Sequence, residues 1–433
     1  MSHEKEDTKM LLQFSVSNFM SLRDEVILSM SANDKDHEHE NVLFSIGSER
    51  ILPVAAIYGA NAAGKSNIFK ALTAAIMIIR QSTSRQIDDR LPWIVPFIFD
   101  DSSAYQVTKF DFIFTTKEKK YQYGFSANRE KIVDEYLYEY KSAWPSKIFE
   151  RTNTSDYTFT KANEKEFRGY VEKNTENKLF LATATAWNCN KTKDAYMWFA
   201  NGIDVYDVKN TEFIGLSTIS KGNNDLKEYL LDTLRKADFN IDSYSFNVRK
   251  ISLEDLKQSD LSDAFPEILK LADPEMDSRQ YEIRTKHNIQ TEKGVNKTYE
   301  LPFIAESEGT QRMFFLAALI KSAMDAGKTM FIDEIDSSLH PILVKFIINM
   351  FNDRNSNHGK AQLIFSTHDV SLLSLDLFRR DQIYFVEKSH TSAVTTLYSL
   401  DEFSPRKTEN VRKGYLQGRY GAIPVIDPGD TLW

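Results

Sequence analysis

The sequence predicts an α/β protein in which a mixed sheet with a parallel core is joined to an antiparallel β subdomain and a compact α+β insert. Three observations predict this fold. The apolar segment Ile51–Tyr58 leads through a glycine-containing loop into a helical run from Asn67 to Ile79. From Gly309 to Leu400, short apolar segments alternate with helical ones, which is typical of a parallel sheet with helices on its faces. Between these parts, residues 93–140 contain strand-like segments separated by turn signals.

The N-terminal part of the chain is predicted to be rich in strands. Leu11–Phe19 alternates apolar and polar residues, as a strand with one buried face does, and Glu25–Met30 supplies a second strand. After the helix that ends near Ile79, four more segments predict an antiparallel sheet packed beside the parallel core. These segments are Trp93–Phe99, Thr108–Thr115, Tyr121–Ser126 and Lys131–Tyr140.

The C-terminal part is predicted to return to the parallel core. Helices are expected over Gly309–Ala326, Ile342–Phe351 and Val370–Phe378, and strands over Thr329–Ile332, Gln362–Ser366, Ile383–Val386 and Val394–Leu400. The predicted domains are an N-terminal half over residues 1–140, an α+β insert or lid over 141–300 and a C-terminal half over 301–433. No heptad pattern is sustained over several turns, so we expect the insert to be compact and not a coiled-coil arm.

Composition excludes several classes of protein. The formal net charge is −8, so no overall basic field points to nucleic acid or to an anionic membrane. A single cysteine, Cys189, cannot form an internal disulfide, which suits a reducing compartment. The first residues are charged, and no apolar run is long enough to span a bilayer. The sequence therefore predicts a soluble cytoplasmic protein.

Gly59–Ser66 reads Gly-Ala-Asn-Ala-Ala-Gly-Lys-Ser and fits the phosphate-loop pattern G-x-x-x-x-G-K-[ST] without a mismatch. The two glycines allow a tight turn, so that backbone N–H groups and the helix N-terminus face a triphosphate. Lys65 is expected to reach the β and γ phosphates, and the Ser66 hydroxyl to bind Mg²⁺. The expected cofactors are ATP and Mg²⁺. The residues expected around the nucleotide are Gly59, Ala60, Asn61, Ala62, Ala63, Gly64, Lys65, Ser66 and Asn67.

Met330–Glu334 is an apolar segment that ends on two adjacent carboxylates. Because neighbouring side chains on a strand point in opposite directions, the two are expected to do different work. We expect Asp333 to bind Mg²⁺, as the second acidic element of phosphate-loop ATPases does. Glu334 is then the candidate that orients and deprotonates the attacking water.

The next predicted strand ends on His368. A lone histidine is more often structural. Here the strand is predicted to lie beside the strand of Glu334, at the sheet edge where ligands of such sheets bind. We therefore expect His368 to sense the γ phosphate or to position the water, since an imidazole can both donate and accept. With Lys65 and Glu334 it completes the candidate catalytic set.

Four segments together resemble the ATPase heads of the ABC, SMC and RecF class. They are Gly59–Ser66, Ser307–Gln311, Asp333–Asp336 and Thr367–His368, and Asn18–Ser21 is similar to the opening strand of RecF and SMC heads. In this class, a Ser-Gly signature of one subunit closes on the nucleotide held by another. The resemblance implies an ABC-type ATPase head in which Ser307 and Gly309 are the signature, Asp336 lies on the subunit-coupling loop and His368 is the switch histidine.

Within that class, the sequence is most similar to the AbiL/RloA-like AAA ATPases of bacterial phage-defence (abortive infection) operons. The segments that carry this similarity are Glu306–Arg312, Asp333–Pro341 and Gly414–Pro424. Glu308 stands where many transport ATPases have a second signature glycine, so transporter behaviour is not implied. Gln81, Gln86 and Gln106 all remain candidates for the glutamine that touches Mg²⁺ in this class. Gly418–Gly421 is expected to be a backbone turn and not a second phosphate site.

Two functions remain open on this evidence. In the first, the chain is an ATPase with sites shared between two copies of itself, the sensor or regulatory subunit of an anti-phage or toxin–antitoxin-like system. It would control a separately encoded effector, such as a nuclease or toxin, with a phage protein as the candidate trigger. In the second, it is a RecF- or SMC-like ATPase that acts on DNA in repair or recombination. The net charge of −8 and the missing coiled-coil arms favour the first. No membrane partner is expected.

Overall fold

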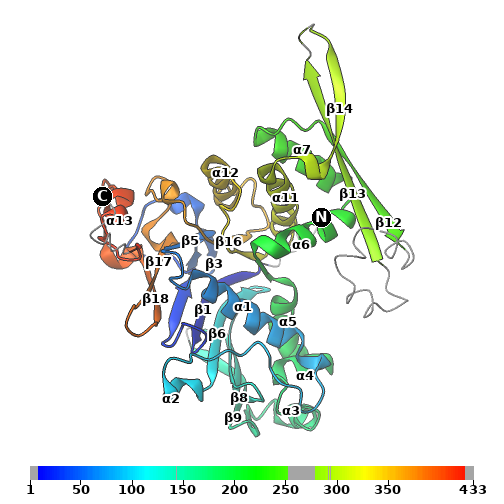
Figure 1. The fold of residues 1–433 in the computed structure, drawn as a ribbon. Coiled ribbons are helices and arrows are strands. Elements are labelled where there is room, and N and C mark those ends of the chain that lie inside the picture. The colour runs from blue at the N-terminus through cyan, green and yellow to red at the C-terminus, as the bar shows by residue number, and fades with distance from the viewer. Residues whose placement is uncertain (1–7, 143, 252–277, 291, 293, 425–433) are drawn as a thin grey trace. The chain divides into compact units, whose positions relative to one another are not determined.

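The computed structural model describes residues 8–142, 144–251, 278–290, 292 and 294–424 (Figure 1). The chain forms two compact units. Unit 1 comprises Met1–Val208, Ala323–Ser337 and Pro341–Trp433, and unit 2 comprises Lys209–Ser322 and Ser338–His340. No helix of the described residues is long and apolar enough to cross a membrane.

A six-stranded sheet in unit 1 is the parallel core of the fold. Its strand order is β11-β15-β16-β5-β17-β18, and every neighbouring pair is parallel except β17 and β18, which are antiparallel. β5 therefore lies between two strands that come more than 300 residues later in the chain. The strands are β5 (Val54–Gly59), β11 (Ile203–Tyr206), β15 (Thr329–Ile332), β16 (Gln362–Ser366), β17 (Ile383–Lys388) and β18 (Thr395–Ser399).

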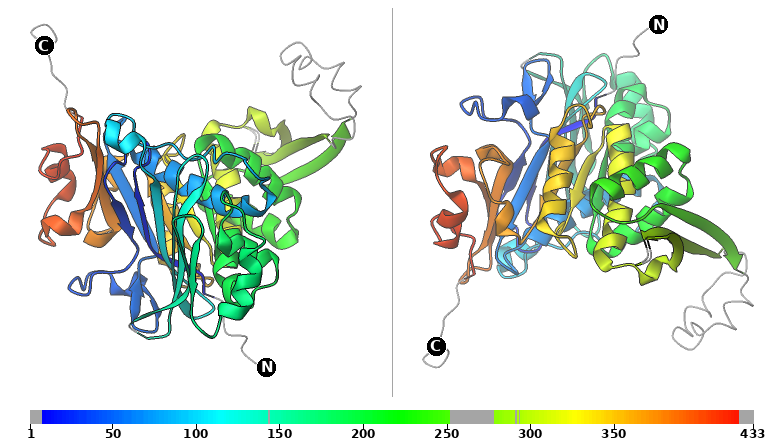
Figure 2. Two further views of the ribbon diagram at one scale, coloured as in Figure 1. Left: turned by 90° about the horizontal axis from the view of Figure 1, so that it is seen from below. Right: turned by 90° about the horizontal axis from the view of Figure 1, so that it is seen from above.

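A seven-stranded antiparallel sheet lies in the same unit, with the strand order β10-β9-β8-β7-β6-β1-β2. Its strands are β1 (Met10–Ser17), β2 (Val26–Ser29), β6 (Thr108–Thr116), β7 (Lys119–Ala127), β8 (Ile132–Tyr140), β9 (Pro145–Thr152) and β10 (Asp156–Phe159). A short hairpin, β3 (Phe44–Ile46) with β4 (Glu49–Ile51), completes the strands of this unit. Figure 2 shows the two large sheets from two further directions.

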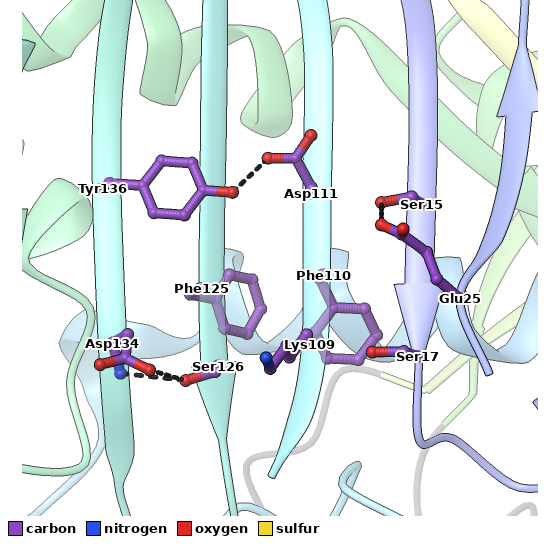
Figure 3. A pocket seen from close by; sticks show the side chains of 10 residues that line it. All are labelled: Ser15, Ser17, Glu25, Lys109, Phe110, Asp111, Phe125, Ser126, Asp134 and Tyr136. Atoms are coloured by element: carbon purple, nitrogen blue, oxygen red, sulfur yellow. Dashed lines mark hydrogen bonds between the residues drawn. The ribbon is translucent and has the colours of Figure 1, made fainter. Parts of the chain in front are cut away.

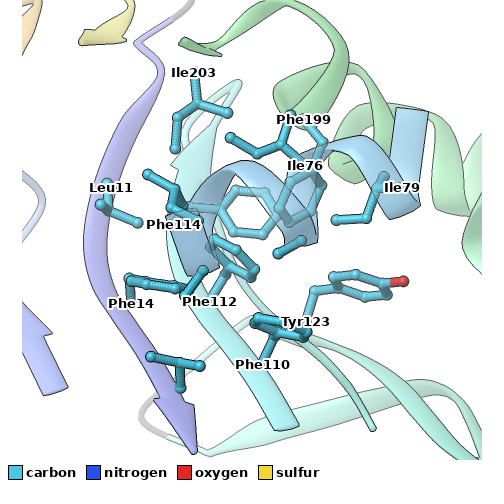
Figure 4. Packing of buried hydrophobic residues seen from close by; sticks show 14 of the residues in the cluster. Leu11, Phe14, Ile76, Ile79, Phe110, Phe112, Phe114, Tyr123, Phe199 and Ile203 are labelled. Atoms are coloured by element: carbon cyan, nitrogen blue, oxygen red, sulfur yellow. The ribbon is translucent and has the colours of Figure 1, made fainter. Parts of the chain in front are cut away.

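Helix α1 (Lys65–Arg80) packs between these two sheets. Its buried side chains Ile76 and Ile79 belong to the same apolar cluster as Phe112 and Phe114 of β6 (Figure 4). Elsewhere in the cluster, Phe69 of α1 makes an edge contact with Phe331 of β15 at 5.9 Å between ring centroids. Burying this apolar surface is the main force that fixes the N-terminus of α1 against the sheet.

The remaining helices of unit 1 are short and cover the sheet faces. The α-helices are α2 (Asp101–Ala104), α3 (Glu164–Val171), α4 (Phe180–Ala186), α5 (Asn190–Asn201), α12 (Pro341–Asn352) and α13 (Val411–Leu416). The 3₁₀ helices are η1 (Glu40–Val42), η2 (Ser82–Ser84), η4 (Val370–Leu372), η5 (Arg380–Gln382) and η6 (Leu400–Phe403).

Unit 2 contains helices and a three-stranded antiparallel sheet of order β12-β13-β14. Within the described residues of this unit, the helices are α6 (Val208–Ser220), α7 (Asn224–Lys236), η3 (Phe303–Ala305) and most of α11 (Glu308–Ala326), whose last turn belongs to unit 1. The strands are β12 (Ser243–Ile251), β13 (Ser278–Gln290) and β14 (Asn296–Pro302).

The predicted fold class is confirmed: a parallel core with a helix on its inner face is joined to an antiparallel sheet. Two element predictions are wrong. Trp93–Phe99 is a loop and not a strand, and only Val370–Leu372 of the segment Val370–Phe378 is helical, as a 3₁₀ turn. The compact units also divide the chain at residues 208 and 322, whereas the predicted insert spans 141–300. Part of that insert, residues 252–277, lies outside the described residues.

Candidate nucleotide site

The loop Gly59–Ser66 joins the end of β5 to the start of α1, as its sequence predicts. Its two motif glycines are required by packing. A Cβ on Gly59 would lie 2.5 Å from the carbonyl oxygen of Val386, and one on Gly64 would lie 2.4 Å from Oγ1 of Thr395. Gly64 also has a φ of 108°, which favours glycine. Strands β17 and β18 therefore leave room for this loop only because it lacks side chains at these positions.

The ammonium group of Lys65 is held inside the loop. Nζ donates to the carbonyl oxygens of Gly59 at 2.8 Å and Ala60 at 3.1 Å, and it lies 3.4 Å from Nδ1 of His368. Burial lowers the pKa of Lys65 to about 8, against the opposing effect of nearby acidic side chains. The ammonium group is thus bonded to uncharged carbonyl acceptors, beside the exposed loop residues Asn61 and Ala62. A phosphate would offer it stronger, charged acceptors.

The two carboxylates Asp333 and Glu334 follow β15, but not in the way that the sequence suggested. The strand ends at Ile332, so both residues lie in the turn after it and strand alternation does not separate them. Instead, the two side chains are separated by the left-handed backbone of Glu334, which has a φ of 54°. This conformation turns the exposed Glu334 away from the partly buried Asp333. For a residue other than glycine, such a conformation is a local strain of the kind that gathers at functional sites.

A serine that the sequence did not single out joins this turn to the next strand. The Ser366 hydroxyl at the end of β16 donates to Oδ1 of Asp333 at 2.5 Å and accepts the N–H of Glu334 at 2.8 Å. It fixes the Asp333 carboxylate and the Glu334 backbone relative to the sheet. No pattern in the sequence distinguishes it from other serines.

His368 follows β16, which pairs with β15 as predicted and also with β5. Its backbone N–H donates to Oδ2 of Asp336 at 3.1 Å, and its exposed ring lies beside Lys65. The structure thus brings His368, Asp336 and the phosphate loop together in unit 1.

Ser307 and Gly309 lie in unit 2, at the N-terminus of α11. The exposed Ser307 hydroxyl is 2.7 Å from Oγ1 of Thr310 and accepts the Thr310 N–H at 3.1 Å, so it caps the helix. A Cβ on Gly309 would lie 2.8 Å from the carbonyl oxygen of Ser338. The segment predicted as a signature is therefore an exposed helix N-terminus, which favours anions.

Residues from the N-terminal strand support the loop from behind. Ser21 accepts a bond from the side-chain amide of Asn67 at 2.7 Å, and its hydroxyl is 2.8 Å from that of Thr395. Thr395 also donates to the carbonyl oxygen of Ala63 at 2.9 Å. Three residues before Ser21, the Asn18 side chain donates to the carbonyl oxygens of Ser103 at 2.9 Å and Gln106 at 3.0 Å and accepts from Phe97. The Asn18–Ser21 segment thus has a physical role: it connects the loop to the antiparallel sheet.

The residues present fit a Mg²⁺-bound nucleoside triphosphate. Helix α1 begins without a side-chain cap, so no capping side chain competes with an anion at its N-terminus. Lys65 supplies a positive charge, and Ser66 and Asp333 supply the hard oxygen atoms that Mg²⁺ prefers. When bound, the metal ion would neutralise charge on the phosphates.

The C-terminal segment Gly414–Pro424 packs on the strand next to the loop. Tyr415 and Tyr420 both stack on Phe385 of β17, with centroid distances of 5.3 and 5.8 Å. Gly418 and Gly421 have φ values of 76° and 66°. They form a backbone turn, as predicted.

A separate hollow of about 560 Å³ lies on the face of the seven-stranded sheet that points away from α1. Tyr136, Asp111, Glu25 and Ser15 line it, and their side chains pair with one another (Figure 3). None of the predicted site residues contributes to it.

The phosphate loop and the polar residues that follow β5, β15 and β16 define a nucleotide-binding protein of the AAA ATPase class. The chain belongs to the family described as "AAA domain, putative AbiEii toxin, Type IV TA system", whose model matches residues 54–374. The predicted relationship to abortive-infection ATPases is confirmed. A search of curated proteins found no match.

Two solved structures illustrate the comparison with known folds. The SMC head domain from Thermotoga maritima aligns over 90% of this chain and 98% of its own, with 12% identity and a TM-score of 0.40. The Smc head domain with an extended coiled coil, bound to the C-terminal domain of ScpA and derived from Pyrococcus furiosus, aligns over 92% of this chain and 98% of its own. Its identity is 13% and its TM-score 0.41.

Proposed function

We propose that the protein hydrolyses ATP at sites shared between two copies of the chain, and that its ATP state controls a separately encoded effector of a defence or toxin–antitoxin-like system. One observation carries the enzymatic part. Polar groups at the carboxyl ends of three adjacent parallel strands, β5, β16 and β15, meet beside the phosphate loop. Ligands of parallel sheets bind at this edge.

The site residues have separate proposed roles. Lys65 binds the β and γ phosphates, and Ser66 and Asp333 hold Mg²⁺. Glu334, exposed and fixed by its strained backbone, orients and deprotonates the attacking water. His368 contacts the γ phosphate. Lys65 and the helix N-terminus stabilise the charge that develops as the phosphoryl group departs, and Mg²⁺ held by Ser66 and Asp333 would supply further positive charge.

Sharing of the site between copies is supported by the chemistry of the Ser307 segment. An exposed helix N-terminus that carries a hydroxyl is an anion-binding element, and the resemblance to ABC and SMC heads assigns this element to the nucleotide of a second subunit. We propose that Ser307 and Gly309 of one copy close on the triphosphate held by Lys65 of the other, with Asp336 at the contact between copies.

The proposed cellular role rests on the family, whose description names a type IV toxin–antitoxin system. The proposed partners are a second copy of the chain, an effector such as a nuclease or toxin, and a phage protein as trigger. The second function, a RecF-like ATPase that acts on DNA, is less favoured because the formal net charge is −8 and DNA binding depends on cationic contacts with phosphates.

ATP hydrolysis by purified protein tests the enzymatic proposal. Glu334→Gln should retain ATP binding and lose hydrolysis. Ser307→Arg and Lys65→Ala should each be inactive alone, and mixing them should restore part of the activity, because a mixed pair contains one intact shared site. Lys345→Ala, a change on α12 away from the loop, is the control. Hydrolysis that never recovers on mixing would contradict shared sites.

Capture of partners tests the cellular proposal. Glu334→Gln should hold the ATP-bound state and Lys65→Ala the ATP-free state, so a true effector should co-purify with one variant more than with the other. Duplex DNA binding that requires ATP and weakens steeply with salt would instead favour the RecF-like function.

A further inference from the structure

Tyr58 is the last residue before the phosphate loop and is 1% exposed, yet its hydroxyl has no hydrogen-bond partner among the described residues. The ring is firmly held, with centroids 6.3 Å from Phe385 and 6.4 Å from Tyr415. Buried hydroxyls are almost always paired, so an unpaired one requires an explanation.

Two carboxylates whose charges act on this hydroxyl, those of Asp336 and Asp369, each have one oxygen that is also buried and unpaired within the described part of the chain: Oδ1 of Asp336 and Oδ2 of Asp369. Burial raises the pKa of Tyr58 well above its ordinary value, and the charges of Asp369 and Asp336 raise it further. The phenol therefore keeps its proton and remains a hydrogen-bond donor, and the two carboxylates that act on it each have a free buried acceptor oxygen.

These two acceptors flank the switch histidine. Asp336 accepts the His368 N–H through its other oxygen at 3.1 Å. Asp369 is the next residue along the chain, and its other oxygen accepts the Ser371 N–H at 2.8 Å. The Asp369 N–H donates to Oγ1 of Thr367 at 3.0 Å. A bond from Tyr58 to Asp369 would thus tie the segment that carries His368 to the strand that carries the phosphate loop.

We propose that Tyr58 is a positioning residue for ATP hydrolysis: in the ATP-bound state its hydroxyl donates to Oδ2 of Asp369 and so holds His368 at the γ phosphate. This inference rests on the proposed ATPase function. Among the described residues the Tyr58 hydroxyl and Oδ2 of Asp369 are both buried and make no hydrogen bond. Catalytic hydrogen bonds of this kind often form only in the substrate complex.

Tyr58→Phe gives a test that separates positioning from structural support. The variant keeps the ring contacts and removes a hydroxyl that is unpaired without nucleotide, so the ATP-free protein should be as stable as the wild type or more stable. The turnover number should fall about tenfold or more, because a bond to a charged acceptor is lost in the reacting state. The KM for ATP should stay close to that of the wild type.

Tyr384→Phe is the matched control, since Tyr384 is another buried tyrosine of the same sheet whose hydroxyl is already paired, with Ser29 at 2.8 Å. It should lower the melting temperature and leave turnover unchanged. Asp369→Asn should reduce turnover, and combining it with Tyr58→Phe should cost little more, as expected for two ends of one bond. Asp376→Asn, on the exposed part of the same segment, should have no effect.

The outcomes distinguish a failure of the positioning role of Tyr58 from a failure of the proposed ATPase function. A wild-type protein that does not hydrolyse ATP overturns the proposed function. Hydrolysis by the wild type with unchanged turnover in Tyr58→Phe overturns the positioning role alone. A lower melting temperature for Tyr58→Phe, or additive losses in the double variant, also overturns it, because either result indicates a structural hydroxyl.

Discussion

The Lys65 ammonium group lies 3.4 Å from Nδ1 of His368 while it donates to the carbonyl oxygen of Gly59 at 2.8 Å. The contact makes Nδ1 the acceptor of the imidazole. A phosphate that draws Lys65 from the loop carbonyls therefore also changes the surroundings of His368. We therefore expect the phosphate loop and His368 to respond together, because both contact the Lys65 ammonium group.

Lys65 should make ATP binding depend on pH. Burial lowers its pKa to about 8 in the ATP-free protein, whereas bound phosphate favours the charged form. ATP binding should therefore be coupled to proton uptake. The number of protons taken up per ATP bound should be close to zero at pH 6 and about one half at pH 8. ATP affinity should fall as the pH rises above 8. Calorimetry in buffers of different ionisation enthalpy measures this uptake.

Lys65→Arg is the control for this effect, because a guanidinium stays charged throughout the range. The variant should lose the proton uptake even if its ATP affinity is lower. Uptake that persists in Lys65→Arg would assign the titrating group to another residue.

Gly64→Ala should abolish nucleotide binding while the rest of the protein stays folded. The added Cβ would lie 2.4 Å from Oγ1 of Thr395, and the φ of 108° is strained for alanine. Binding of a fluorescent ATP analogue measures the loss. Gly169→Ala is the control: this glycine of α3 has nothing within 4 Å of an added Cβ, so the change should leave binding intact and stabilise the helix by about 0.5–1 kcal/mol.

Ser366→Ala should weaken the Mg²⁺ site without removing a proposed ligand. The hydroxyl holds both the Asp333 carboxylate and the Glu334 N–H, so its loss frees the turn that carries both acids. The Mg²⁺ concentration needed for half-maximal ATP hydrolysis should rise about tenfold, the effect expected of a group that orients a metal ligand. Ser366→Thr, which keeps the hydroxyl, should restore most of the loss, and equal Mg²⁺ requirements in wild type and Ser366→Ala would contradict the role.

Glu135→Gln should destabilise unit 1 by about 3 kcal/mol. The fully buried Glu135 carboxylate accepts the N–H groups of Phe180 at 2.6 Å and Leu181 at 2.9 Å and the Tyr123 hydroxyl at 3.0 Å. It also lies 3.9 Å from the buried guanidinium of Arg151. The amide nitrogen that replaces one carboxyl oxygen cannot accept a hydrogen bond, so at least one of these buried donors loses its acceptor. Urea-unfolding midpoints measure the change, and Glu130→Gln on an exposed turn should have none.

The stability difference between Glu135→Gln and wild type should depend on pH. Burial raises the pKa of Glu135 in the folded protein, so the folded state holds this proton more tightly than the unfolded state does. The stability from that proton is present below the unfolded pKa and is lost as pH rises through the folded pKa. The deficit of Glu135→Gln should therefore be larger at pH 4.5 than at pH 8, and a constant deficit would contradict the assignment.

Elements of the parallel core could be predicted from sequence because each is a short apolar run with a clear end. Thr329–Ile332 and Gln362–Ser366 agree with the structure at both ends. Trp93–Phe99 has a similar apolar pattern, but Pro92 and Pro96 stand within or beside it and lack the N–H that a strand needs. Its backbone bonds go to Asn18 and Met20 instead.

The helix predicted over Val370–Phe378 is formed only as a short 3₁₀ turn, because side chains compete for its backbone N–H groups. Asp369 and Ser374 accept the N–H groups of Ser371 and Asp376, and such local bonds replace the helical ones. The periodicity of apolar residues did not reveal them.

The site could be predicted only as far as its local motifs extend. Local sequence was enough to identify the phosphate loop, Asp333, Glu334 and His368, because each is a characteristic residue type that follows an apolar strand. The residues that hold them in place could not be identified from sequence. Ser21, Ser366 and Thr395 are common residue types, and their partners lie far away in sequence. The unpaired hydroxyl of Tyr58 is visible only when its surroundings are known.

The strand order has a consequence for how the protein is made. β5 pairs only with β16 and β17 in the described sheet. During synthesis, more than 300 further residues must therefore be added after the phosphate loop before these two strands are available to pair with β5. A chain that stops early has a complete loop sequence but no sheet to shape it, and Ser21 has no Thr395 to meet. The chain should therefore bind ATP only after β16, β17 and Thr395 have been synthesised, and products that end before them should not bind it.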